Sequence, residues 1–386
     1  MRQFFKKIAL IFFGISLGVI ILETTVRFLP EPAPPRLLSL IEPDSYIGTI
    51  YKKNLDTYIE AEDDRRNTVP FRTNSFGFIG ENWASEKREM RITNYGDSFT
   101  AGLAVPYEKN YVSTLGNVLS DRSGIKIESL NFGITGQGTK DALETYRYYG
   151  QQAGGDIVFL WMYLGNDFLD NFGNVTAPTY GAVTTDKSLT EKKVSLILKL
   201  LKKSELVFFI KDTVAQASWG HRVFSVLSKI PGMKQFIYKI TLAEYPLPIP
   251  LDLLLMFTEH EKNGIALEET KKYVQEFSHM VAKNGGKFFV VLVPAHFQVD
   301  KSAELYLYKQ YPELLSYGFD TLRPNRTVEE MLEGLSISHL DLTAAFIKAY
   351  NEGHSLYICR FCHFNEEGHR LAGETVAEWF YRNNVN

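Results

Sequence analysis

Short apolar runs alternate with helical patterns along most of the chain after residue 90. Five of the runs are bounded by turn residues and predict strands, at residues 91–95, 125–131, 157–163, 287–293 and, more weakly, 336–342. Apolar positions at helical spacing predict helices at residues 112–119, 140–151, 267–284 and 369–380. Because strands that alternate with helices form parallel sheets, the pattern predicts a three-layer α/β/α sandwich around a five-stranded parallel sheet.

The beginning of the chain has the pattern of a membrane segment. Three basic residues precede an apolar run at residues 8–22, and the run reaches twenty-two residues if it extends to Leu29 with Glu23 and Arg27 near the interface. The basic flank predicts a signal anchor, residues 1–29, with the N-terminus in the cytoplasm and the body of the protein outside. A cleaved signal peptide and a buried core helix are the alternatives.

The rest of the chain divides into a connector, a body and an insertion. Four prolines within residues 30–35 predict an extended connector, which begins an N-terminal segment of residues 30–90. The body, residues 91–386, contains an insertion at about residues 172–262 that breaks the alternation. Within it, residues 186–240 hold eleven basic and four acidic residues, a local charge of +7. A basic amphipathic helix here would lie on an anionic membrane, cover the active site as a lid, or pack on the body with its lysines in solvent.

The composition narrows the class of protein. The chain has 386 residues, of which 45% are hydrophobic and 23% charged, and this excludes a disordered chain and a multi-span membrane protein. Its 42 basic and 45 acidic residues give a net charge of -3, so the overall charge does not indicate a nucleic-acid partner. Two cysteines exclude a framework of several disulfides.

Residues with catalytic chemistry follow the predicted strands where these end. An acid and a serine follow the first strand, a glycine-rich turn follows the second, and an asparagine and an acid follow the third, while a histidine precedes the last helix. In order, these residues are Asp97, Ser98, Gly136, Asn166, Asp167 and His363. Since ligands bind at the carboxyl ends of parallel strands, we expect these residues to meet at one edge of the sheet.

These blocks, in this order, resemble those of the SGNH hydrolases, also called GDSL-type esterases, over roughly residues 91–380 apart from the insertion. The resemblance implies a flavodoxin-like SGNH fold with Ser98 as nucleophile and His363 as base, and with neither metal nor cofactor. It implies an oxyanion hole of the Ser98 and Gly136 amides and the Asn166 side chain. Asp97 and Asp167 are expected to support the turns that aim Ser98 and Asn166.

Two further details of the resemblance concern segments next to these blocks. Gly136 is preferred over Gly133 because the family's glycine stands five residues after the asparagine that ends the strand, here Asn131. Residues 73–78 look like a segment that membrane-anchored members carry before the nucleophile.

The chain departs from the family pattern at two positions. Leu164 replaces the first glycine of the third block, which is a mild change. Arg360 stands three residues before His363, where the family has an aspartate that orients the imidazole and stabilises its protonated form. Three explanations remain open: a substitute acceptor, such as a backbone carbonyl or Asp341, a dyad of Ser98 and His363, or a pseudoenzyme.

A second motif overlaps the histidine block. Cys359, Cys362 and His363 fit the C-x-x-C-H signature for attachment of c-type haem, which would make the histidine an iron ligand instead of a base. The other interpretations of these cysteines are zinc binding with His354 or His369, a local disulfide and two free thiols. Another histidine, His296, follows the fourth strand and could line a substrate cleft.

Together these patterns predict a membrane-anchored serine ester hydrolase with its catalytic domain outside the cytoplasm, in the periplasm or at the cell surface. The resemblance to membrane-anchored family members implies that the substrate is an O-acyl ester, of which acetyl is one candidate, on a carbohydrate or lipid of the envelope. An O-acyltransferase on the same substrates and a catalytically degenerate glycan-binding domain are the alternatives.

Overall fold

The computed structural model describes residues 37–60, 68–84, 89–167, 263–358 and 363–384, together with residues 14, 18, 253 and 256–259. All of these except residues 14 and 18 belong to one compact unit of residues 33–177 and 249–386. Among the described residues, no helix combines the length and apolar character needed to cross a bilayer. The proline connector lies outside the described residues, and so do the predicted membrane segment and the basic insertion except for residues 14, 18, 253 and 256–259.

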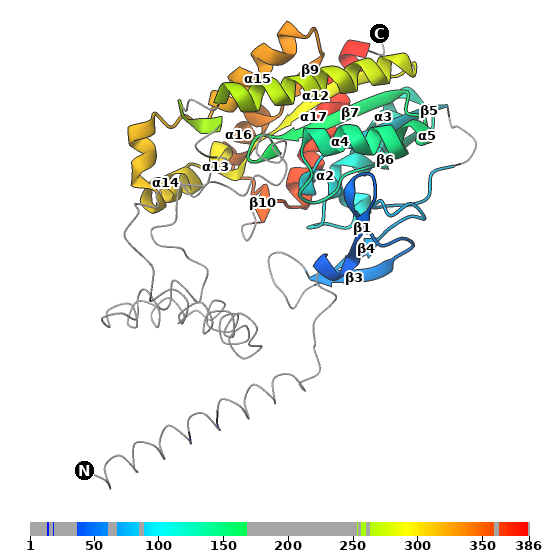
Figure 1. The fold of residues 1–386 in the computed structure, drawn as a ribbon, viewed down its shortest axis with the longest axis horizontal. Helices are drawn as coiled ribbons and strands as arrows, with labels where there is room; N and C mark the ends of the chain where they lie inside the picture. The colour runs from blue at the N-terminus through cyan, green and yellow to red at the C-terminus, as the bar shows by residue number, and fades with distance from the viewer. Residues whose placement is uncertain are drawn as a thin grey trace, which may run out of the picture. The chain divides into compact units, whose positions relative to one another are not determined.

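A five-stranded parallel sheet forms the centre of this unit, as the sequence predicts (Figure 1). The strand order is β6-β5-β7-β8-β9, which is the flavodoxin-like order 2-1-3-4-5 when the five strands are counted along the chain. The strands are β5 (Met90–Tyr95), β6 (Ile127–Asn131), β7 (Ile157–Tyr163), β8 (Lys287–Val293) and β9 (His339–Asp341). The weak run at residues 336–342 is therefore a strand, but only three of its residues pair with β8.

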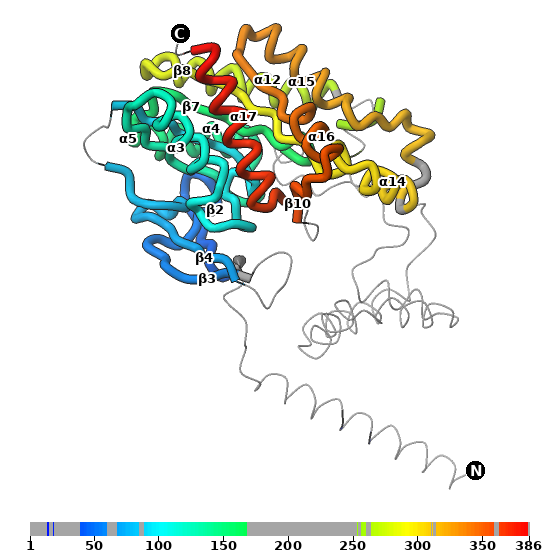
Figure 2. Tube along the Cα trace, turned by 180° about the vertical axis from the view of Figure 1, so that it is seen from behind, coloured from blue at the N-terminus to red at the C-terminus, as the bar shows by residue number. Residues whose placement is uncertain are grey.

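Helices cover both faces of the sheet, which explains why its strands are almost continuously apolar. On one face, Val158 and Leu160 of β7 share a core with α4 (Thr139–Thr145), α12 (Asn263–Lys283) and α15 (Arg323–Gly334). On the other face, Phe159 and Trp161 share a core with α3 (Tyr111–Ser123), α16 (Thr343–Asn351) and α17 (Glu366–Asn384). Figure 2 shows α3 and α17 side by side on this second face. The predicted three-layer sandwich is confirmed.

The N-terminal segment adds two small hairpins, for which the sequence showed few periodic signals. After the short helix η1 (Leu37–Leu40), β1 (Ile41–Asp44) pairs with β2 (Gly48–Tyr51), and β3 (Asp56–Glu60) pairs with β4 (Thr68–Arg72). Tyr51, Phe71 and Phe78 are buried in the same core as Tyr95 of β5 and Phe132, the residue after β6. The hairpins are thus part of the fold that carries the sheet.

Shorter elements connect the main ones, and several lie at the carboxyl edge of the sheet. The helices are α2 (Ser98–Ala101), η2 (Tyr107–Lys109), the π-turn η3 (Tyr146–Gly150), α5 (Gln151–Ala153), α13 (His296–Val299), α14 (Lys301–Gln310) and η4 (Pro312–Tyr317). The strands β10 (Tyr357–Ile358) and β11 (His363–Phe364) form a two-stranded antiparallel pair. The predicted helix at residues 140–151 corresponds to α4 continued through the π-turn η3.

Candidate active site

The structure brings Ser98 and His363 together. Ser98 Oγ lies 2.7 Å from His363 Nε2, although the two residues are 265 positions apart in the chain. Both side chains are half-buried at the carboxyl edge of the sheet, Ser98 as the first residue of α2 and His363 as the first residue of β11. At this distance a neutral imidazole can accept the serine proton, which is the first requirement for a serine nucleophile.

Asp97 holds the turn that presents Ser98. Its Oδ1 accepts a hydrogen bond from the Phe99 N–H at 2.9 Å and so caps α2, while its Oδ2 lies 3.5 Å from Ser98 Oγ. Burial raises the pKa of Asp97 to about 6, against the opposing effects of the Phe99 N–H and of His363. Asp97 therefore bonds to the backbone of the turn that carries Ser98.

The turn after β6 packs against the start of α2. Asn131 donates from Nδ2 to the Thr100 carbonyl at 2.7 Å and accepts the Gly133 N–H through Oδ1 at 2.8 Å. A Cβ on Gly133 would lie only 2.4 Å from the backbone nitrogen of Ala101, so this position requires glycine. Since the Gly133 N–H is already engaged, Gly133 has no amide to offer an oxyanion. The sequence preference for Gly136 agrees with this observation.

Gly136 has the properties that an oxyanion donor needs. It is exposed, and a Cβ at this position would meet nothing within 4 Å. Its φ of +75° lies in the left-handed region that glycine adopts most easily. Among the hydrogen bonds of the described residues, none uses the N–H of Gly136 or that of Ser98. These two amides can therefore donate to a negatively charged oxygen.

Asn166 lies in the turn after β7, half-buried at the same edge of the sheet. The turn is held by Asp167, whose Oδ2 accepts the Tyr163 N–H at 2.8 Å, and by the Leu164 N–H, which donates to the Val293 carbonyl of β8 at 3.1 Å. Leu164, the departure from the family pattern, is fully buried in the core. Asp167 thus bonds to the backbone of the turn that carries Asn166.

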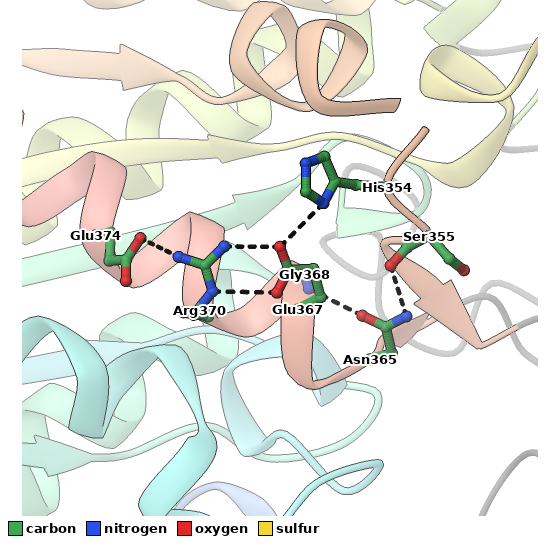
Figure 3. Close-up of polar contacts among 7 residues, drawn as sticks. All are labelled: His354, Ser355, Asn365, Glu367, Gly368, Arg370 and Glu374. Atoms are coloured by element: carbon green, nitrogen blue, oxygen red, sulfur yellow. Dashed lines mark hydrogen bonds and ion pairs between the residues drawn. The ribbon is translucent and has the colours of Figure 1, made fainter. Parts of the chain in front are cut away.

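The residues after His363 connect the histidine to α17. Asn365 caps this helix by accepting the Gly368 N–H through Oδ1 at 2.9 Å, and it donates from Nδ2 to the Ser355 carbonyl at 2.8 Å (Figure 3). Phe364, between the histidine and the cap, is fully buried, and its ring lies 4.9 Å from that of Phe99. The strand that carries His363 is therefore fixed at both α2 and α17.

The other acid and histidine candidates have different partners. Asp341 accepts hydrogen bonds from Asn325 Nδ2 and the Thr343 N–H, each at 2.8 Å, so the structure does not pair it with His363. His296 lies 3.2 Å from Asp300 Oδ2, and burial lowers its pKa. In the part of the chain that the structure describes, no group of three or more His, Cys, Asp or Glu residues could hold a metal.

The segment around Arg360 lies outside the described residues. Cys359 and Cys362 belong to this segment, so haem attachment, zinc binding and a disulfide at the C-x-x-C-H motif stay hypotheses from the sequence. The same holds for the effect of Arg360 on His363. Sequence reasoning did not assign a supporting role to Asn131 or Asn365, whose amides bond to backbone groups in the turns beside Gly136 and His363.

No protein-family model and no curated protein sequence matches this chain. Solved structures that resemble it include LAE5, an alpha/beta hydrolase from the metagenome of Lake Arreo, Spain, with a TM-score of 0.39 and 13% identity over 77% of this chain and 95% of that chain. A catalytic mutant of Axe2, an acetylxylan esterase from Geobacillus stearothermophilus, has a TM-score of 0.37 and 13% identity over 78% of this chain and 95% of that chain. TesA has a TM-score of 0.39 and 10% identity over 76% of this chain and 99% of that chain. Similarity this low carries no conclusion about activity.

Proposed function

We propose that the chain is a serine ester hydrolase of the SGNH type. The observation that carries the proposal is the 2.7 Å contact between Ser98 Oγ and His363 Nε2, at the edge of a flavodoxin-like sheet. The sequence blocks around Ser98, Gly136, Asn166 and His363 support the proposal. The first three lie in the turns after β5, β6 and β7, and His363 lies on β11 beside Ser98.

In the proposed reaction, Ser98 Oγ attacks the carbonyl carbon of an ester while His363 Nε2 takes the hydroxyl proton. The carbonyl oxygen becomes negatively charged in the tetrahedral intermediate, and the Ser98 N–H, the Gly136 N–H and the Asn166 amide donate to it. His363 then gives the proton to the departing alcohol oxygen, which leaves an acyl group on Ser98. A water molecule, deprotonated by His363, releases the acid in the second half of the reaction.

The substrate we propose is an O-acyl ester on an envelope carbohydrate or lipid, met outside the cytoplasm. This part rests on the predicted signal anchor at residues 1–29 and on the resemblance of residues 73–78 to membrane-anchored family members. The anchor would hold the protein at a membrane surface, where such acceptors are found.

Replacing the nucleophile tests the proposal. We expect Ser98→Ala to lower the rate of p-nitrophenyl acetate hydrolysis at least about a thousandfold, because no other group supplies the attacking oxygen. We expect Asn166→Ala to lower it about a hundredfold, the usual effect of losing one oxyanion donor. A fluorophosphonate probe should label the wild-type protein at Ser98 and leave Ser98→Ala unlabelled.

Ser123→Ala is the matched control, because Ser123 ends α3 and its hydroxyl donates to the Leu119 carbonyl at 2.7 Å. This variant should keep both hydrolysis and labelling. Ester hydrolysis by Ser98→Ala at the wild-type rate would reject the proposed function.

A further inference from the structure

We propose that Tyr51, from the N-terminal hairpins, is a positioning residue for the turn that carries the oxyanion amide of Gly136. The proposal rests on the proposed function, because it assigns Tyr51 to that reaction. The turn of residues 133–138 is called the oxyanion loop below. Tyr51 precedes this loop by more than eighty positions, and no sequence motif connects the two.

The Tyr51 hydroxyl makes two hydrogen bonds to the residue directly before Gly136. It accepts the Thr135 N–H at 3.1 Å, and it lies 2.9 Å from Thr135 Oγ1. Burial raises the pKa of Tyr51 to about 12, with the charge of Asp97 acting in the same direction, so the hydroxyl keeps its proton at neutral pH. A neutral hydroxyl that accepts the Thr135 N–H can donate its own proton to Thr135 Oγ1. The Tyr51 side chain then holds both the N–H and the Oγ1 of Thr135.

The residue directly after Gly136 is also tied to the first hairpin. Gln137, which is buried, donates from Nε2 to the Ile47 carbonyl at 3.3 Å. Ile47 lies in the turn between β1 and β2, and Tyr51 ends β2. Both neighbours of Gly136 are therefore bonded to the same hairpin, while Gly136 itself is exposed.

Tyr51 is well fixed in its own surroundings. Its side chain is 0% exposed, and its ring packs edge-on against Phe71 of β4 with 5.4 Å between centroids. The loop it holds has little internal support around Gly136, where the hydrogen bond from the Gln137 N–H to the Ile134 carbonyl is long, at 3.3 Å. A rigid, buried hydroxyl thus fixes a loop segment that has few bonds of its own.

The direction of the Gly136 N–H matters because an oxyanion donor acts only when it is aimed at the position of the developing charge. Without the Tyr51 hydroxyl, Thr135 loses the acceptor of its N–H and the partner of its Oγ1, so Thr135 can shift and turn the peptide that joins it to Gly136. The amide nitrogen of Gly136 belongs to this peptide. Its rotation weakens binding of the transition state but leaves binding of the ground-state ester largely unchanged.

The test compares two tyrosine variants that each lose one hydroxyl. Tyr51→Phe removes the bonds to Thr135. Tyr149→Phe is the control, because its hydroxyl bonds to Asp44 Oδ2 of the same hairpin at 2.5 Å and makes no bond to the oxyanion loop. We expect Tyr51→Phe to lower kcat about tenfold with KM changed less than about twofold, and Tyr149→Phe to retain wild-type kcat. The affinity for a phenylboronic acid, which forms a tetrahedral adduct on serine, should fall in Tyr51→Phe by about the same factor as kcat.

A kcat of Tyr51→Phe within about twofold of wild type, or an equal loss in Tyr149→Phe, would overturn the proposal. If Tyr51→Phe does not fold, Thr135→Val supplies the test, because it keeps the N–H bond and loses only the Oγ1 contact. Its kcat should fall about threefold, and an unchanged kcat would overturn the proposal. Ser98→Ala distinguishes the proposed esterase function from the proposed role of Tyr51. If Ser98→Ala is inactive while Tyr51→Phe is fully active, the esterase function is supported and the role of Tyr51 is rejected.

Discussion

Two side chains next to the nucleophile bind backbone groups. Asp97 accepts the Phe99 N–H, and Asn131 accepts the Gly133 N–H while it donates to the Thr100 carbonyl. The bond from Asn131 to the Thr100 carbonyl ties the turns after β5 and β6 to each other, and the other two bonds hold each turn internally. The geometry of Ser98 therefore depends on polar residues that need not touch a substrate.

The sequence could identify Ser98 and His363 because each stands in a short block of turn residues at the end of a predicted element. It could not identify Asn131 or Asn365 as supports, since an asparagine at a turn has many possible partners. Nor could it show that Asp341, a carboxylate of suitable chemistry, bonds to Asn325 and Thr343. Those assignments depend on side-chain directions that appear only in the folded chain.

Two of the three glycines of the oxyanion loop, Gly133 and Gly136, give a residue-scale prediction about stability. A Cβ on Gly133 would lie 2.4 Å from a backbone atom, whereas one on Gly136 would meet nothing within 4 Å and suffers only from its φ of +75°. We expect Gly133→Ala to lower the free energy of unfolding by about 3 kcal/mol. Gly136→Ala should lower it by about 1 kcal/mol. Urea denaturation of both variants measures the difference, and equal losses would contradict the steric argument.

At the scale of elements, long apolar runs were predicted well and short hairpins were not. The runs at residues 157–163 and 287–293 have the bounds of β7 and β8, because strands buried on both faces are apolar throughout. In β4, Val69 and Phe71 are buried and their neighbours are exposed, but Pro70 interrupts this five-residue pattern. A proline within so short a run weakens the strand signal in the sequence.

α17 carries a buried histidine whose protonation should affect stability. His369 is 1% exposed, its Nδ1 accepts the Tyr111 N–H at 3.4 Å, and burial lowers its pKa to about 3. The unfolded chain takes up a proton near pH 6.5 and the folded chain does not. Stability from this residue is therefore present above pH 6.5 and is lost as the pH falls toward 3.

We expect the free energy of unfolding of the wild type, minus that of His369→Gln, to fall by about 2 kcal/mol between pH 7 and pH 5. Taking the difference between the two proteins cancels the titration of other groups, including Asp97. Urea titrations at pH 7, 6 and 5 measure it. A difference that does not change with pH would show that His369 titrates equally in both states.

At the scale of the whole molecule, the parallel direction of the strands follows from the alternation of strands and helices, and so does the meeting of strand ends at one edge, whereas the order of the strands was implied only by the family resemblance. The packing of the N-terminal hairpins on this edge does not follow from any local pattern. The contact between Tyr51 and Thr135 spans 84 positions, and the polar groups involved are common in loops. Contacts of this kind form only when the core has assembled, so the sequence of either segment alone does not predict them.

The predicted signal anchor gives a test for the full chain. We expect the complete protein to stay in the membrane pellet after extraction with alkaline carbonate, because about 20 apolar residues suffice to span a bilayer. A variant that lacks residues 1–29 should appear in the supernatant. Recovery of the complete protein in the supernatant would contradict the anchor and leave the esterase proposal untouched.

The shared core of the hairpins and the sheet sets a limit on how short a recombinant fragment can be. A fragment that starts at Met90 would retain the five central strands but would uncover Tyr95, Phe132 and Ile134, which now lie in that core. Newly exposed aromatic surface of this kind favours aggregation. Expression for crystallography should therefore begin no later than Leu37, even when only the catalytic sheet is of interest.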